Sequence, residues 1–141
     1  GEAELLKVGA VASYIKSGDE VREVGSATLP LCILQEIRAD LLREKLEDGD
    51  LLVMVTDGMV ELSPETGENW LLGALREVKH HHPQIVADRL IEEACYRWPK
   101  GIKDDLTVLV CRVQSLFEKK KEKEPGQSFS KKEKTTIAAS F

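Results

Sequence analysis

Hydrophobic and polar residues alternate over short stretches in the first third of the chain, as they do in β-strands with one buried face. Turn residues separate these stretches, most clearly at positions 17–19. The pattern predicts a β-meander with strands over Glu4–Val11, Ala12–Lys16 and Glu20–Val24.

A continuous apolar run at Leu51–Thr56 predicts a strand that is fully buried. The preceding segment, Ile37–Leu46, has a helical composition but an alternating pattern, and the acidic stretch 47–50 between the two contains a glycine. We therefore expect 37–46 to form a hairpin with 51–56. Another apolar, β-branched run predicts a last strand over Leu106–Val113.

The middle of the chain has the three-to-four-residue spacing of amphipathic helices. A first helix is expected to begin with Ser63 as its N-cap and Pro64 in its first turn. A second helix is expected to begin near Pro83 and to end at Pro99 and Gly101. Its predicted apolar stripe consists of Ala87, Leu90, Ile91, Ala94, Cys95 and Trp98.

Composition favours one globular domain over a membrane-spanning or nucleic-acid-binding protein. Of the 141 residues, 42% are hydrophobic and 32% are charged, and the net charge is −5. No apolar run approaches the roughly 18 residues that span a bilayer, and no secretory signal pattern is present. Because the chain begins with Gly rather than Met, we expect it to be part of something longer.

The composition changes after residue 117. Seven Lys and four Glu lie from Glu118 onward, with no periodic apolar face until Ile137. We expect a domain over 1–117 and a Lys/Glu-rich flexible tail over 118–141. A polybasic contact with a membrane or a partner is the alternative for this tail.

Three cysteines and three consecutive histidines could suggest metal or redox chemistry, but their spacing argues against both. Cys32, Cys95 and Cys111 are far apart and lie in apolar surroundings, so we expect reduced core residues and a cytoplasmic protein. Consecutive histidines point in different directions, so we expect His80–His82 to form a solvated loop between two helices.

The strongest chemical signal is the position of acidic residues at the ends of the two apolar strands. Asp57 follows one strand, and Asp104 and Asp105 precede the other. If these strands are antiparallel neighbours, the carboxylates converge, and they repel one another unless a cation or protons intervene. Mg²⁺ and Mn²⁺ favour such oxygen ligands, and Gly58 permits a sharp turn beside them. The alternative is a plain α/β domain in which these aspartates only form turns and caps.

The stretches "DGDLLVMVTDGMVE" and "KDDLTVLVCRV" together resemble two late motifs of metal-dependent PPM-type (PP2C-like) Ser/Thr protein phosphatases. The match is closest to the branch of the stage II sporulation protein E. The earlier stretch "LLKVGAVASYIKSGDEVREVGSATLPLCIL" is similar to a segment of the same family. The resemblance implies an α/β fold, part of an antiparallel β-sandwich flanked by helices, with the N-terminal half of the domain absent from this chain.

The resemblance also implies a binuclear Mn²⁺ or Mg²⁺ site and attack on phosphorus by a metal-activated water. By motif, Asp57 and Asp104 are the expected metal ligands, and Gly58 and Asp105 are expected to support the site from behind. Two positions depart from the pattern: Cys32 stands where relatives have Gly, and Lys103 where the sporulation branch often has a third acid.

The family's first Asp-Gly motif, whose Asp bridges both metals, is not in this sequence. We therefore expect the isolated chain to turn over little substrate, and a homodimer or strand exchange to cover the incomplete sheet edge. The resemblance implies a phosphorylated anti-anti-sigma factor as substrate, no nucleic-acid partner, and a parent protein anchored in the membrane through an upstream region. The rival interpretation is a non-catalytic, phosphatase-like interaction module.

Overall fold

The computed structural model describes residues 1–25, 28–30, 33, 39–60, 70–98 and 104–115, together with the backbone of 136–138. The predicted helix start at Ser63 and Pro64 lies outside these ranges, as do Cys32 and Lys103. The strands are β1 (Glu2–Lys7), β2 (Ser13–Ser17), β3 (Glu20–Val24), β4 (Asp40–Lys45), β5 (Leu51–Val55), β6 (Val108–Gln114) and β7 (Thr136–Ala138). The helices are α1 (Asp57–Val60), α2 (Trp70–Glu77) and α3 (Pro83–Arg97).

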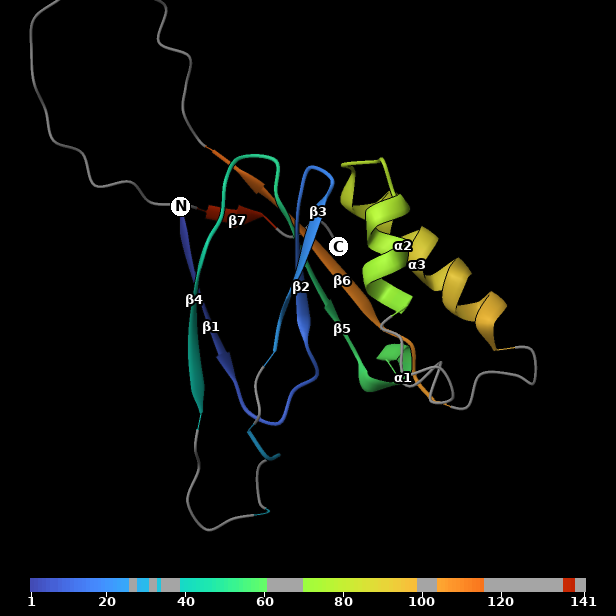
Figure 1. Cartoon of the computed structure of the whole chain (residues 1–141), viewed down its shortest axis with the longest axis horizontal. Coiled ribbons are helices and arrows are strands. Elements are labelled where there is room, and N and C mark those ends of the chain that lie inside the picture. Colours follow the sequence, from blue (N-terminus) through green and yellow to red (C-terminus); the bar gives the residue numbers. More distant parts are fainter. Residues whose placement is uncertain are drawn as a thin grey trace, which may run out of the picture.

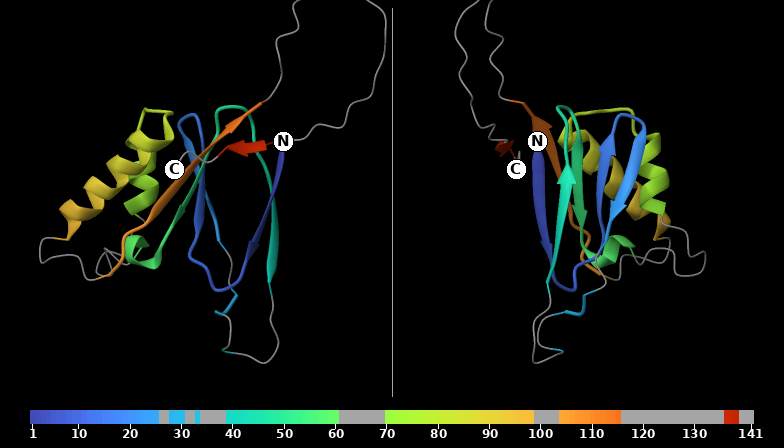
Figure 2. Two further views of the ribbon diagram at one scale, coloured as in Figure 1. Left: turned by 180° about the vertical axis from the view of Figure 1, so that it is seen from behind. Right: turned by 60° about the vertical axis from the view of Figure 1, so that its left-hand side comes forward.

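The strands form two antiparallel sheets. The larger has the order β3-β2-β5-β6-β7, and the smaller pairs β1 with β4. Figures 1 and 2 show the small sheet on one side of the large sheet and helices α2 and α3 on the other. The result is a β-sandwich with helices on one outer face, as the fold prediction requires.

The central strands contribute to two cores because their side chains alternate between the two faces of the large sheet. On β2, Tyr14 packs with the helices, whereas its neighbour Ile15 packs with the small sheet. Likewise, Leu51 and Val53 of β5 face the helices, and Leu52 between them faces the small sheet. Strand β5 is therefore held on both faces as well as on both edges.

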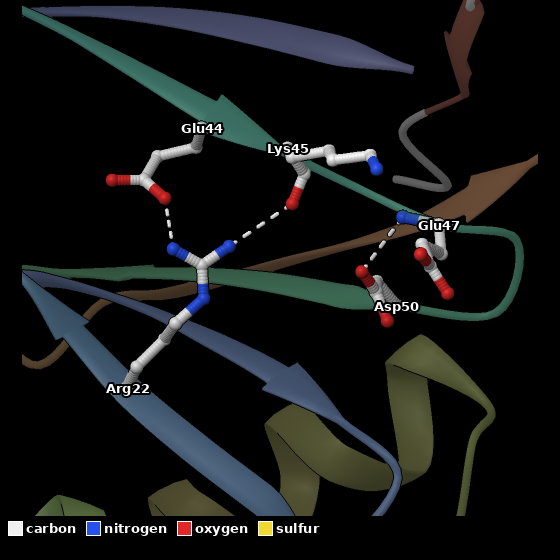
Figure 3. Close-up of polar contacts among 5 residues, drawn as sticks. All are labelled: Arg22, Glu44, Lys45, Glu47 and Asp50. Carbon is white, nitrogen blue, oxygen red and sulfur yellow. Dashed lines mark hydrogen bonds and ion pairs between the residues drawn. The ribbon is translucent and has the colours of Figure 1, made fainter.

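The β2–β3 hairpin of the predicted meander is confirmed, but the first strand pair of the meander and the predicted hairpin of 37–46 with 51–56 are wrong. β1 pairs with β4 rather than with β2, and β4 does not pair with β5. The acidic turn at 47–50 does form. Within it, the Asp50 carboxylate accepts a hydrogen bond from the Glu47 backbone N–H (2.8 Å, Figure 3). This turn carries the chain from one sheet to the other. The physical reason is that β5 is already paired with β2 and β6 along its two edges.

Arg22 on β3 joins the two sheets at their surface (Figure 3). Its guanidinium forms an ion pair with Glu44 of β4 and also donates a hydrogen bond to the Lys45 carbonyl oxygen (3.0 Å). One side chain thus binds a carboxylate and a main-chain oxygen of the facing sheet, a use for which the forked guanidinium is well suited. The contact fixes the small sheet against the edge strand of the large one.

Helix α3 begins and ends where the sequence predicts, with Pro83 in its first turn. Its buried residues are Val86, Leu90 and Ala94, which recur every four residues and lie against the large sheet. Cys95 is exposed, so its assignment to the core is wrong. The physical reason is that the buried stripe runs through 86, 90 and 94. The following positions lie at its margin, where Ala87 and Ile91 are still partly buried but Cys95, near the end of the helix, is exposed.

Part of the segment 118–141 has a described backbone. Residues 136–138 form β7, which pairs antiparallel with the end of β6, Ile137 lying opposite Val113. The flexibility expected of the remaining segment stays a prediction. Among the residues that the structure describes, no helix combines the length and apolarity needed to span a membrane.

The one-turn helix α1 lies against the chain just before β6 (Figure 1). A Cβ atom placed on Gly58 would lie 2.6 Å from the Asp105 carbonyl oxygen and 3.3 Å from the Asp104 Cβ. The first of these separations is shorter than real Cβ atoms tolerate. A glycine is therefore required here for close approach of two backbone segments.

The first testable prediction concerns the two described cysteines. Burial raises the pKa of the Cys111 thiol, which is 4% exposed, whereas Cys95 is exposed. Because the thiolate is the reactive species, brief treatment with iodoacetamide should alkylate Cys95 and spare Cys111, as measured by peptide mass spectrometry. Denaturant should abolish the difference. Equal labelling in the folded protein would contradict the buried position of Cys111.

The second prediction concerns the close approach at Gly58. Gly58→Ala should lower the free energy of unfolding by about 1–3 kcal/mol, because the added methyl group collides with the Asp105 carbonyl. The matched control is Gly73→Ala in α2, where an added Cβ meets nothing within 4 Å. That change should stabilise the helix by up to about 1 kcal/mol. Urea unfolding measures both, and a neutral Gly58→Ala variant would disprove the close contact.

Candidate functional site

The site lies where β5 ends and β6 begins. The two strands are antiparallel neighbours, and the ladder between them closes with Val55 opposite Val108. In such a pair the residues that follow one strand lie beside those that precede the other. Asp57, the first residue of α1, is therefore brought to the same rim as Asp104 and Asp105. The structure meets the condition that the sequence argument set for these motifs to converge.

Thr56 makes the joint between the two segments. Its backbone N–H donates to the Thr107 carbonyl oxygen (3.1 Å). Its hydroxyl donates to the Asp105 carbonyl oxygen (2.9 Å) and accepts from the Thr107 N–H (3.0 Å). Three hydrogen bonds from one residue thus continue the contact between the chains beyond the last ladder pair.

Asp57 and Asp104, here called the two outer aspartates, are each hydrogen-bonded to the backbone of the next residue. The Asp57 Oδ1 accepts a hydrogen bond from the Gly58 N–H (3.0 Å), and the Asp104 Oδ1 accepts one from the Asp105 N–H (2.8 Å). All three aspartates are exposed. Asp105 contributes its main-chain carbonyl to the Thr56 hydroxyl, in keeping with a supporting position.

The donor chemistry of this rim fits a hard divalent cation in part. Among the described residues, no ion pair joins Asp57, Asp104 or Asp105 to a basic side chain. Carboxylate oxygens without a cationic partner are the ligands that Mg²⁺ and Mn²⁺ prefer. Within the same part of the chain, no group of three or more His, Cys, Asp or Glu side chains could hold a metal ion. This rim therefore offers part of a ligand set.

Helix α1 is held by Trp70 of α2, a residue that the sequence patterns did not single out. The Trp70 indole N–H donates to the Met59 carbonyl oxygen (2.8 Å), and this hydrogen bond is buried. Met59 itself is fully buried in the core beneath the helices. The bond ties α2 to the turn that presents Asp57. A tryptophan at the start of a helix carried no signal that could have revealed this contact.

The three histidines lie far from the acidic rim. His80, His81 and His82 are exposed and connect α2 to α3. Figure 1 shows this connection and α1 at opposite ends of the helical layer. His82 occupies the N-cap position of α3 and makes no side-chain capping bond. The histidines and the acidic rim are therefore separate features of the molecule.

Comparison with known proteins identifies the family to which this chain is similar. The family model described as Stage II sporulation protein E (SpoIIE) matches residues 1–114. The Stage II sporulation protein E of Bacillus subtilis (strain 168) is 39% identical over 113 residues, which cover 78% of this chain. The matched region spans 14% of that protein, so the chain corresponds to a small part of its length.

Two solved structures give the same result. The PP2C phosphatase domain of SpoIIE from Bacillus subtilis, solved with a fragment of its regulatory domain, superposes with a TM-score of 0.74 at 36% identity. The superposed region covers 80% of this chain and 34% of the solved SpoIIE chain. The Mn-presoaked SpoIIE phosphatase domain gives a TM-score of 0.71 at 33% identity, over 84% of this chain and 53% of the other. With its sequence and its sandwich fold both matched, this chain belongs to the Stage II sporulation protein E family of PP2C-type phosphatases.

Proposed function

We propose that this chain forms one side of the metal site of a Mn²⁺- or Mg²⁺-dependent phosphoserine/phosphothreonine protein phosphatase. The proposed substrate is a phosphorylated anti-anti-sigma factor, as the resemblance to the sporulation branch implies. The observation that carries the proposal is the hydrogen-bonded joint between β5 and β6. It holds Asp57 and Asp104 at one exposed rim, where their negative charges favour a cation.

The proposed role of each residue follows from its position. Asp57 and Asp104 would hold the cations through carboxylate oxygens, which the hydrogen bonds to the following N–H groups orient. Gly58 allows the two backbones to approach, and Asp105 supplies the carbonyl that anchors the joint. When bound, a pair of divalent cations supplies an activated water and neutralises charge on the phosphoryl oxygens.

The comparisons support the metal dependence indirectly. A SpoIIE phosphatase domain that is 33% identical to this chain was studied in a Mn-presoaked form. The present chain covers 53% of that domain. Two carboxylates alone bind a hard cation weakly, because Mg²⁺ and Mn²⁺ sites use several oxygen ligands. We therefore infer that catalysis requires residues of the parent protein that lie outside this chain.

The alternative is a non-catalytic, phosphatase-like module that docks to a partner. The observation that favours it is the ligand count, since the described residues offer only two outer carboxylates and no cluster of three ligands. The upstream sequence of the parent protein discriminates between the two functions. A strand followed by Asp-Gly there would supply the bridging ligand and favour the enzyme.

The third prediction tests the enzyme directly. Asp57→Asn in the natural full-length protein should reduce Mn²⁺-dependent hydrolysis of a phosphoserine protein by more than about a hundredfold. Losing groups that merely orient metal ligands already costs 10–100-fold, and the amide removes a ligand's charge. Release of inorganic phosphate at several Mn²⁺ concentrations measures the effect.

The matched control is Asp88→Asn on the exposed side of α3, where the carboxylate accepts a hydrogen bond from Gln84. This variant should retain the wild-type rate. A full-length protein without activity in Mn²⁺ and Mg²⁺ would favour the docking module. An active protein in which Asp57→Asn changes nothing would remove Asp57 from the metal site.

A further inference from the structure

Thr56 occupies an unusual place between the last residue of β5 and the first residue of α1. At this point the backbone leaves the strand direction for the helix, so the regular ladder to β6 stops at Val55 and Val108. Beyond this pair one main-chain bond remains, from the Thr56 N–H to the Thr107 carbonyl oxygen (3.1 Å). The Thr56 hydroxyl adds two more bonds to the opposite chain, one to the Asp105 carbonyl oxygen and one from the Thr107 N–H.

A hydroxyl can do this because it is both donor and acceptor. The distances of 2.9 and 3.0 Å are ordinary for good hydrogen bonds. A methyl group in the same place would satisfy neither the carbonyl nor the N–H. Serine keeps the hydroxyl, whereas valine has nearly the same shape and lacks it.

The bridge lies next to both outer aspartates in the sequence. Asp57 follows Thr56 directly, and Asp104 precedes the bridged Asp105. Each of the two carboxylates is bonded to the N–H of the following residue, so its position depends on the local backbone. The separation of the two backbones therefore sets the separation of the two carboxylates.

We propose that Thr56 is a positioning residue for the metal site. Its hydroxyl fixes the spacing of Asp57 and Asp104, and this spacing sets the affinity for the divalent cation. The inference rests on the proposed phosphatase function. A site held to within a fraction of an ångström binds and catalyses better than a loose one, so the effect should be on metal binding more than on the reaction at saturation.

The fourth prediction compares Thr56→Val with Thr56→Ser in the natural full-length protein. Thr56→Val should weaken Mn²⁺ binding about tenfold, because removing a group that supports a metal ligand typically costs this much affinity. Thr56→Ser keeps the hydroxyl, so its affinity should stay within about twofold of wild type. Isothermal titration with Mn²⁺ measures the affinity without turnover. At saturating Mn²⁺, Thr56→Val should recover most of the wild-type rate, and amide hydrogen exchange at Thr107 should be faster than in wild type.

A control separates positioning from general stability. Val53 lies in β5, the strand that Thr56 follows, and is fully buried in the core under the helices, so Val53→Ala should lower stability without changing the Mn²⁺ affinity. If Thr56→Val and wild type bind Mn²⁺ equally, the positioning role is wrong while the phosphatase function stands. The same holds if Val53→Ala weakens Mn²⁺ binding as much as Thr56→Val does. If the wild-type protein neither binds Mn²⁺ nor releases phosphate, the proposed function itself fails.

Discussion

The antiparallel pairing of β5 with β6 is the constraint on which the site depends. β5 is buried between two cores and paired along both edges, so its position leaves little freedom to shift. A register slip by one residue would exchange every side chain between the two cores. The same pairing that satisfies the core therefore fixes which residues meet at the rim, and distant motifs at Asp57 and Asp104 become neighbours.

The rim that results is costly for a protein that only needs to fold. Asp57 and Asp104 lie on adjoining backbone segments and form no ion pair with a basic side chain among the described residues, although solvent screens part of their repulsion. A glycine is also required at Gly58, which gives up conformational entropy on folding. The proposed cation site would account for two carboxylates held at one rim, because local rules for stability are commonly broken at functional sites.

Sequence patterns predicted the elements better than their partners. The alternating stretch of β3, the apolar run of β5 and the limits of α3 were all visible locally. The pairing of β1 with β4 was not, because partners distant in the sequence leave no local signal and the acidic turn at Asp50 resembles a hairpin. At the site, the aspartates could be recognised from the sequence because they flank the two apolar strands. Thr56 could not, because its role depends on main-chain atoms supplied by the opposite strand.

The proposed metal site is divided between two strand ends, and this division limits how its affinity for a cation could be regulated. Within this chain, the backbone on either side of the rim is held by the Thr56 bridge and by the buried bond from Trp70 to α1. In the proposed metal site, this backbone would be in place before a cation binds, so binding need not include the free-energy cost of ordering it. What remains to be gained is the rest of the coordination sphere. A rim that is rigid but short of ligands makes affinity depend steeply on each additional oxygen donor. Regulation of such a site would therefore act most effectively on the segment that brings the missing ligand, rather than on the strands described here.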